Sequence, residues 1–524
     1  MLIPLDSRPA CAEHPVKAAR VAGREVRTPP AELLGDLLTP GNSEGVLAWL
    51  DEAALSADAV VVSADMVATG GLVPSRMPDT ALATALARLE RLREVRRRMS
   101  PGCPLYVFSI VQRIAPTTLD AGSGAIAQDI ANYVRILSQA EEEGRKDLKA
   151  QADAIRARVP DAALARYYEA RQRNHAVNLQ ALQLVANGVI DALVLGRDDT
   201  ALYGPHVAEL RALRARVDAL GIADRVMIYP GADEIAMTLV TREVVREARP
   251  VRVWSEVFPR SAAEDVQPYD DRPLRVSIED SIVSSGCREA RSPSGADLVF
   301  IVVARSGQEM TDEQVAEVTT AAAGEVDRWC RHGNSVAVAD IIRVNISEPQ
   351  LVARLAERKV LPRLAAYAGW GAASNTMGTA LAQGVCRVVG DRLRGSDLAS
   401  AQLAGQRFTF ERLADDYLYL TQIRPPLAQR LGVDGYSSRL NGRTAEVADA
   451  VAQAMVSETP ALFATTFADA AIDLYGLPAR LRDRGIRARL PWPRMFEVAV
   501  DVDLSTLRGG KPGTAPGLAQ EPAS

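Results

Sequence analysis

The chain has 524 residues, of which 48% are hydrophobic and 24% charged, the composition of a soluble globular protein with room for several domains or one large barrel. Its net charge of −5 argues against a nucleic-acid partner, because basic residues are not in excess. The five scattered cysteines, the absence of a signal peptide and the absence of an apolar run of membrane-spanning length lead us to expect a cytoplasmic protein with no membrane partner.

Short apolar runs alternate with longer amphipathic stretches along the chain, a pattern typical of β/α units. Polar or glycine-rich groups follow nearly every run, as expected where a site is built at the carboxyl ends of parallel strands. We therefore predict an α/β fold with a TIM-barrel-like parallel β/α core. The runs are 2–5, 59–63, 105–111, 192–195, 226–228, 298–303, 336–338 and 364–367.

The predicted barrel-like core covers residues 1–395 and carries a highly charged helical insertion at about 120–180. Within the core, the apolar spacing predicts helices over 82–99 and 312–331, the latter with Thr311 as its N-cap.

Beyond residue 395 the strand signal fades, and we predict a mostly helical C-terminal addition over 396–505, packed on the core. It would contain helices over 408–419 and 444–457 and end in a strand at 496–500. The Gly-, Pro- and Ala-rich residues 506–524 are predicted to be a disordered tail.

The segment 226–235 is the most informative part of the chain. An apolar β-branched run ends at Pro230-Gly231, and two adjacent carboxylates follow, Asp233 and Glu234. Neighbouring side chains of a strand point to opposite faces, so both acids can enter one pocket only where the backbone turns. The alternative interpretation is a helix N-terminus whose acids complement the helix dipole.

Asp198 and Asp199 follow another predicted strand and precede Tyr203 and His206. Two acids, a phenol and an imidazole within nine residues suit recognition of sugar hydroxyls or ligation of a metal. A simple turn capped by an aspartate explains the same residues.

Two further predicted strand ends carry candidate ligand contacts. Asp6 and Arg8 follow the first run and would bind a ligand or form one ion pair. Asp65 precedes a Gly-Gly pair and Arg76, where glycines permit close approach of a ligand to the backbone or simply serve a loop.

The Trp370 segment is the second strong signal. Tyr367 ends a predicted strand, Trp370 lies between glycines, and a polar trio containing Asn375 opens a helix. A Trp exposed on a loop can stack on the apolar face of a sugar ring, and Asn can bind its hydroxyls. The helix N-terminus could equally hold an anion, or Trp370 could belong to the core beside an Asn cap.

Cofactor motifs are missing. The chain contains four isolated histidines, none in a metal-binding pair, and neither a glycine-rich nucleotide loop nor a serine nucleophile elbow. We expect no cofactor and no resident metal, although binding of a divalent ion by the aspartate-rich strand ends stays open.

Several of these segments together resemble the bacterial domain-of-unknown-function family 4127. The matching blocks are 3–9, 63–66 with 70–76, 173–174, 198–199 with 203–204, 230–234, Asp340, 367–370 with 375–376, and 490–497. The chain departs from the pattern of that family at Gly371 and over 341–346. The family name implies no activity.

The Asp233-Glu234 pair also resembles the pair of N-acetylhexosaminidases in glycoside hydrolase families 20 and 123. This resemblance implies substrate-assisted retaining catalysis, in which the acetamido oxygen of the sugar is the nucleophile. Asp233 would then polarise the acetamido group, and Glu234 would be the general acid and base. Trp370 would stack on the sugar. The remaining candidates would bind hydroxyls or orient the pair: Asp6, Arg8, Asp65, Arg76, Asp198, Asp199, Tyr203, Tyr367 and Asn375.

The expected function is therefore release of terminal β-linked N-acetylhexosamine, with N-acetylgalactosamine favoured, from a small-molecule or oligosaccharide substrate. Two alternatives stay open, a divalent-metal-dependent hydrolase or lyase and a non-catalytic sugar-binding or small-ligand-binding protein. A homo-oligomer is likewise an open alternative.

Overall fold

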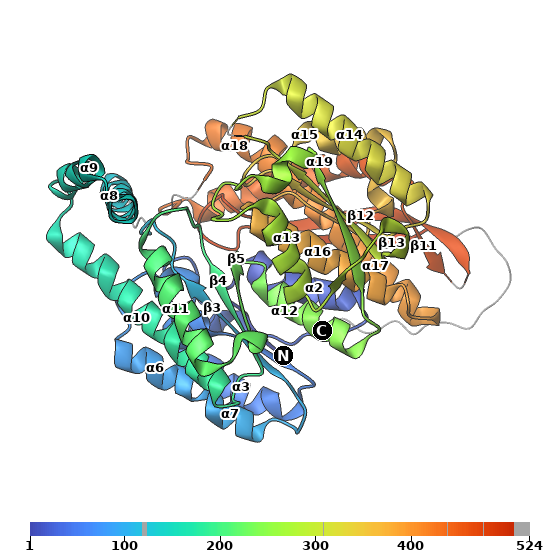
Figure 1. The fold of residues 1–524 in the computed structure, drawn as a ribbon. Coiled ribbons are helices and arrows are strands. Elements are labelled where there is room, and N and C mark those ends of the chain that lie inside the picture. Colours follow the sequence, from blue (N-terminus) through green and yellow to red (C-terminus); the bar gives the residue numbers. More distant parts are fainter. Residues whose placement is uncertain (118–122, 308, 437–438, 475, 508–524) are drawn as a thin grey trace.

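A computed structural model describes residues 1–117, 123–307, 309–436, 439–474 and 476–507. It contains two parallel sheets of five strands each and a three-stranded antiparallel sheet near the C-terminus (Figure 1). The α/β class and the parallel strands agree with the prediction.

The first sheet has its strands in the order of the chain, β1-β2-β3-β4-β5. Alternate side chains of these strands enter two separate apolar clusters. For example, Val60 and Val62 pack on one face, and Val61 packs on the other. The strands are β1 (Leu2–Ile3), β2 (Val60–Ser63), β3 (Leu105–Val111), β4 (Ala192–Arg197) and β5 (Val226–Pro230).

The second sheet has the order β10-β9-β8-β6-β7, so that the short β7 lies at one edge and β10 at the other. The strands are β6 (Arg252–Phe258), β7 (Arg288–Glu289), β8 (Leu298–Ala304), β9 (Val336–Ile341) and β10 (Ala366–Ala368).

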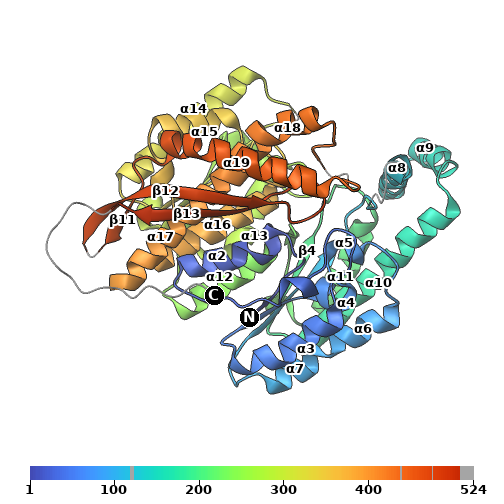
Figure 2. The same cartoon turned by 180° about the vertical axis from the view of Figure 1, so that it is seen from behind.

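Each sheet is covered by helices on its outer face (Figures 1 and 2). The first sheet is covered by α3 (Ser43–Ala53), α4 (Ala64–Thr69), α6 (Leu82–Glu90), α7 (Leu92–Arg98), α10 (Asp161–Ala186) and α11 (Pro205–Leu220). The second is covered by α14 (Asp312–Arg331), α15 (Pro349–Glu357), α18 (Arg424–Leu431) and α19 (Thr444–Thr466).

Between the two sheets lies a layer of helices that both inner faces share, formed by α2 (His14–Val21), α12 (Ile235–Glu247) and α16 (Ala373–Gly390). Almost every residue of α16 is buried, which is expected of a helix enclosed on all sides. Small residues let these helices approach one another. A Cβ added to Gly390 would lie 2.1 Å from the carbonyl oxygen of Val21 in α2.

The remaining helices connect or extend this framework. The predicted insertion is helical and consists of α8 (Ser123–Glu143), α9 (Lys146–Arg156) and the start of α10. Short helices follow β1, β2 and β6: α1 (Pro9–Ala12), α5 (Leu72–Ser75) and α13 (Leu274–Ser284). Single 3-10 turns cover Ala31–Leu33, Ala54–Ser56, Ala223–Arg225, Arg260–Glu264, Pro293–Gly295 and Leu361–Arg363.

The C-terminal region begins with α17 (Gly395–Arg412), which continues directly into a π-helix over Leu413–Ile423. After α18 and α19 the chain forms an antiparallel sheet that packs against the outer cluster of the second parallel sheet. Its strands are β11 (Ala471–Leu474), β12 (Leu477–Arg489) and β13 (Ala499–Thr506).

The structure corrects the barrel prediction. Among the described residues the strands form two open sheets and no closed barrel, because β5 does not pair with β6 and β1 does not pair with β10. Buried parallel strands carry the same continuous apolar runs in a barrel and in a helix-covered open sheet. The C-terminal region is helical as predicted over its first part, but the sequence indicated only one of its three strands.

Other elements agree more closely with the sequence. Thr311 caps α14 through a reciprocal capping box with Gln314. The helix predicted over 82–99 is divided at Arg91 into α6 and α7. The strand β6 was missed because its polar and charged residues interrupt the apolar pattern. The predicted tail at 506–524 lies, from residue 508 onward, outside the described residues.

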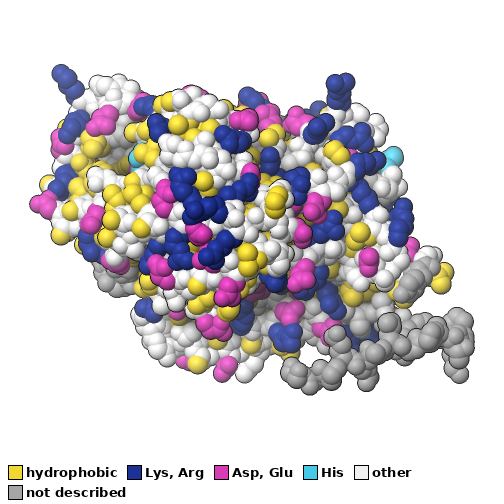
Figure 3. Space-filling model, turned by 90° about the horizontal axis from the view of Figure 1, so that it is seen from below, with side chains coloured by type: hydrophobic (Ala, Val, Ile, Leu, Met, Phe, Trp, Pro, Cys, Tyr) yellow, Lys and Arg dark blue, Asp and Glu magenta, His cyan; other side chains and the backbone are white. Residues whose placement is uncertain are grey.

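Acidic and basic side chains alternate over the face shown in Figure 3, in keeping with the small net charge of the chain. No helix in the described part of the chain is long and apolar enough to cross a membrane.

The packing of α16 on α2 can be tested with two matched glycine substitutions. Gly390→Ala places a methyl group against the Val21 carbonyl and should lower the free energy of unfolding by about 1–3 kcal/mol. Gly324→Ala in α14 meets nothing within 4 Å and should raise it by about 0.5–1 kcal/mol. Denaturant midpoints measure both changes in the free energy of unfolding. Equal shifts in the two variants would contradict the close approach of α16 to α2.

Candidate functional site

The turn after β5 has the form that the sequence predicted. The strand ends at Pro230, and Gly231 has φ +126°, a conformation available to glycine. A Cβ at Gly231 would also lie 2.0 Å from Glu234 Oε1, so a larger residue would displace the Glu234 carboxyl group. Asp233 and Glu234 directly precede α12, so the pair lies at a helix N-terminus and also at the strand end.

Arg8 links this turn to the end of β1. Its Nη1 donates to Asp233 Oδ2 at 2.8 Å and its Nη2 to Asp233 Oδ1 at 2.6 Å. Its Nε donates to Asp6 Oδ1 at 3.0 Å. All three residues are buried, so one guanidinium is shared between two enclosed carboxylates. The ion pair that the sequence left as an alternative for Asp6 and Arg8 is therefore formed.

Glu234 lies behind Asp233, between the turn and α16. It is 2% exposed, and its Oε2 accepts a hydrogen bond from Ala232 N at 3.0 Å. A Cβ on Gly378 of α16 would lie 2.3 Å from Glu234 Cγ, which shows how tightly the side chain is enclosed. Burial raises the pKa of Glu234 to about 8, so the carboxyl group is protonated at neutral pH.

A cavity of about 360 Å³ opens where the carboxyl ends of the two sheets meet the C-terminal region. This volume is within the range of small-molecule sites. Seven of the predicted site residues line it, namely Arg8, Arg76, Asp198, Asp199, Asp233, Trp370 and Asn375.

One wall of the cavity is acidic. Asp198 and Asp199 follow the last residue of β4, and Asp198 Oδ2 accepts a hydrogen bond from Arg76 Nη2 at 2.5 Å. Asp199 has φ +36°, unusual for a residue with a side chain, and its Oδ2 lies 3.5 Å from Arg113 Nη1. Burial and the neighbouring Asp198 raise the pKa of Asp199 to about 6.

A second group of lining residues is aromatic or carries an amide. Trp370 is half-buried at the junction of three apolar clusters and also faces the cavity. Asn375 accepts from Ala232 N at 3.3 Å, which ties the start of α16 to the turn after β5. Two guanidinium groups lie over the ring of Trp492, that of Arg8 at 5.0 Å and that of Arg494 at 4.7 Å from its centre.

Five predicted residues do not line the cavity. Asp6 and Glu234 lie behind its wall, as described above. Asp65 accepts a hydrogen bond from Ile110 N at 3.0 Å and so holds the start of α4 to β3. Tyr203 donates to Glu143 of α8 at 2.6 Å, and Tyr367 donates to Asp340 at 3.0 Å beneath the Trp370 loop.

Several cavity residues were not singled out by the sequence. They are Arg113, Tyr269, Asn345, Tyr436, Trp492, Arg494 and Phe496. A signal was available for Arg113, which follows the predicted strand end at Val111. Trp492 lies within the block 490–497 of the family resemblance, and its Nε1 donates to Ser7 Oγ at 2.9 Å, near the end of β1.

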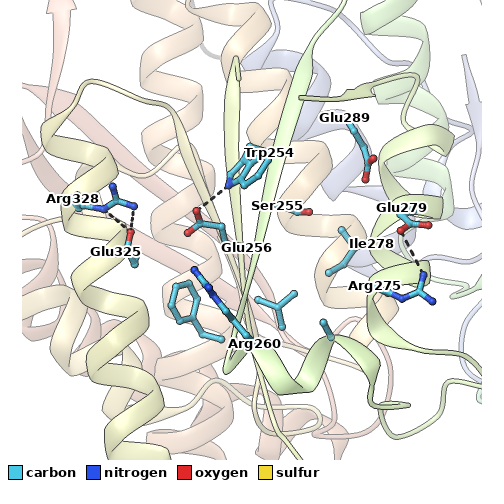
Figure 4. A pocket seen from close by; sticks show the side chains of 13 residues that line it. Trp254, Ser255, Glu256, Arg260, Arg275, Ile278, Glu279, Glu289, Glu325 and Arg328 are labelled. Carbon is cyan, nitrogen blue, oxygen red and sulfur yellow. Dashed lines mark hydrogen bonds and ion pairs between the residues drawn. The ribbon is translucent and has the colours of Figure 1, made fainter. Parts of the chain in front are cut away.

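A second hollow, of about 560 Å³, lies along β6, between α13 and α14 (Figure 4). Trp254 and Glu256 project into it from the strand, and Trp254 Nε1 donates to Glu256. Its charged side chains from α14 are paired with each other, and it contains none of the predicted residues. Within the described ranges, no group of three or more His, Cys, Asp or Glu side chains has the arrangement of a metal site.

The raised pKa of Glu234 predicts how stability depends on pH. The folded state holds a proton that the unfolded state loses near the ordinary Glu pKa, so this contribution to stability falls as pH rises towards about 8. Burial raises the pKa of Asp65 and Asp270 to about 7, in the same direction. We therefore expect the melting temperature to fall between pH 5.5 and pH 8.

Glu234→Gln should flatten this dependence by up to about 1.4 kcal/mol per pH unit, because the amide is neutral at every pH. Glu317→Gln, on the exposed face of α14, is the matched control and should keep the wild-type slope. Thermal unfolding across the pH series measures the effect. Equal slopes in the two variants would show that Glu234 is already ionised in the folded state.

The residues that line the cavity come from many parts of the chain, and a match to a known protein family covers all of these parts. A family model described as "Protein of unknown function (DUF4127)" matches residues 1–501 and therefore includes every cavity residue named above. A search of curated proteins finds no match. The chain belongs to the DUF4127 family.

Proposed function

We propose that the protein is a glycoside hydrolase that releases terminal β-linked N-acetylhexosamine, with N-acetylgalactosamine favoured, by substrate-assisted retaining catalysis. The observation that supports this best is the cavity itself. It brings carboxyl groups, a half-buried Trp and an Asn to one space of about 360 Å³. Hydrolysis of a glycoside needs a pair of carboxyl groups and a surface that binds the sugar ring.

The residues that line the cavity offer a sugar two kinds of contact, an apolar stacking surface and hydrogen-bonding groups. Trp370 offers a flat apolar surface to one face of the ring, and Asn375 offers an amide to its hydroxyls. Arg76 lines the cavity, and its buried Nε has no hydrogen-bond partner among the described residues. Arg113 adds a second guanidinium on the same side.

Substrate-assisted catalysis needs one carboxylate to polarise the acetamido group and one acid to protonate the leaving oxygen. The sequence assigned these roles to Asp233 and Glu234. Asp233 reaches the cavity but both of its oxygens accept hydrogen bonds from Arg8, and Glu234 has a suitable proton but lies behind the wall. Asp198 and Asp199 are the other carboxyl groups on the wall.

The proposed function predicts a strong requirement for the N-acetyl group. The enzyme should hydrolyse nitrophenyl β-N-acetylgalactosaminide at least about 100-fold faster than the 2-hydroxy galactoside, because only the former carries its own nucleophile. Release of nitrophenol measures both rates. Equal rates would contradict substrate assistance, loss of activity with a chelator would indicate the metal-dependent hydrolase, and binding without turnover would indicate a sugar-binding protein.

Trp370→Ala should raise KM for the same substrate at least about tenfold while kcat falls less, because the stacking surface acts in ground-state binding. Trp329→Ala is the control, since Trp329 packs on Arg328 of α14, away from the cavity. Initial rates over a range of substrate concentrations measure both constants. An unchanged KM in a folded Trp370 variant would rule out the stacking surface.

A further inference from the structure

The proposed reaction leaves one structural question, namely which carboxyl groups can touch the substrate. A proton donor must come within hydrogen-bond reach of the leaving oxygen. Glu234 is 2% exposed, is enclosed by Gly231 and Gly378, and does not line the cavity. Asp233 lines the cavity, but each of its oxygens already accepts a hydrogen bond from Arg8. Of the pair that the sequence emphasised, Glu234 does not reach the cavity and Asp233 is held in a bidentate ion pair.

Asp198 and Asp199 satisfy this requirement. Both line the cavity, and the Asp199 side chain is 40% exposed. Asp198 uses only its Oδ2 in the ion pair with Arg76, and its Oδ1 has no hydrogen-bond partner within the described parts of the chain.

The backbone explains how two successive side chains enter one cavity. Within β4 neighbouring side chains alternate between the two faces of the sheet. The strand ends at Arg197, and Asp199 then adopts φ +36°, in the left-handed region, which redirects the chain. A conformation of this kind costs free energy in a residue with a side chain, and such costs are often found at functional sites.

We propose that Asp198 and Asp199 are the catalytic carboxyl groups of this site, with Asp198 polarising the acetamido group and Asp199 donating and later accepting the proton. This assignment rests on the proposed glycosidase function. Asp233, with Arg8, then shapes the cavity wall as a positioning residue.

The electrostatic surroundings support the division of roles. Asp198 and Asp233 oppose ionisation of Asp199, and Arg113 and Arg76 favour it. The largest contribution is partial removal of the carboxyl group from water at the cavity wall, where 40% of the side chain stays exposed, and the pKa of Asp199 is raised to about 6. Asp198 instead forms an ion pair with Arg76 through its Oδ2. Two adjacent carboxyl groups in unequal environments are a recurring arrangement for an acid and its charged partner.

The chemistry balances with these groups alone. The acetamido oxygen bonds to the anomeric carbon as the bond to the leaving oxygen breaks, and that oxygen takes the Asp199 proton. Asp198 accepts a hydrogen bond from the acetamido N–H and stabilises the cyclic cation. Water then adds to the anomeric carbon and gives its proton to the Asp199 carboxylate, while the ring opens to restore the acetamide.

The leaving group distinguishes the two roles. Asp199→Asn should lose at least about 100-fold in kcat/KM on an alkyl N-acetylgalactosaminide and much less in the first step on a dinitrophenyl glycoside, which needs no proton. Asp198→Asn should be slow on both. Asp224→Asn, an exposed residue just before β5, is the matched control and should match the wild type.

The pH profile separates Asp199 from Glu234. A general acid works in its protonated form, so kcat/KM on the alkyl substrate falls as pH rises through the pKa of the acid. The fall should come near pH 6 for Asp199 and near pH 8 for Glu234. Asp199→Asn should remove this fall.

Stability provides a readout independent of activity. Asp199→Gly relieves the left-handed backbone and should leave the melting temperature unchanged or raise it while hydrolysis is lost. A merely structural Asp199 would give the opposite, a lower melting temperature with activity retained in the folded fraction.

The outcomes are separable. If the wild type neither hydrolyses an aryl N-acetylgalactosaminide nor binds the thiazoline mimic of the cyclic intermediate, the proposed function fails and this assignment fails with it. If the wild type is active but Asp199→Asn keeps its rate on alkyl substrates, only the assignment is overturned. If Glu234→Gln shows the leaving-group dependence instead of Asp199→Asn, then Glu234 is the general acid.

Discussion

The hydrogen bonds of Arg8 hold the candidate site together. β1 and β5 are the two edge strands of the first sheet, and one guanidinium connects Asp6, after β1, to Asp233, after β5. Such a buried arrangement is stable only if every charge keeps its partner, since an unpaired buried carboxylate costs several kcal/mol. Arg8 also stacks on Trp492, which brings the C-terminal segment to the same place.

Burial explains the protonation of the acids that lie behind the cavity wall. The guanidinium of Arg8 serves Asp6 and Asp233, whereas Glu234 forms no ion pair within the described residues. Burial raises the pKa of Glu234 to about 8 and of Asp270 to about 7, and Asp270 Oδ2 has no hydrogen-bond partner among the described residues. These two carboxyl groups remain protonated at neutral pH because removal from water opposes their ionisation.

The sequence predicted where chemistry-bearing residues leave the strands better than it predicted how the strands are assembled. The turn at Pro230-Gly231 and the acids after β4 and β5 could be located because glycine, proline and carboxylates interrupt apolar runs. Whether the strands close into a barrel could not be predicted, since buried parallel strands have similar sequences in barrels and in open sheets. The sequence did offer one indication of a helix between two sheets, because small and apolar residues occur on every side of α16, and the structure shows nearly all of them buried.

The site itself was predicted in part for a similar reason. Local pattern identifies a residue at a strand end but not the direction of its side chain, so Asp65 and Tyr203 seemed equivalent to Asp199. Their hydrogen bonds to Ile110 and Glu143 direct them into the framework, whereas the left-handed backbone of Asp199 directs it into the cavity. Trp492 and Arg494 come from the far end of the chain, so the cavity is complete only when the C-terminal region packs on both sheets. This dependence gives a physical reason for one family pattern to extend over residues 1–501.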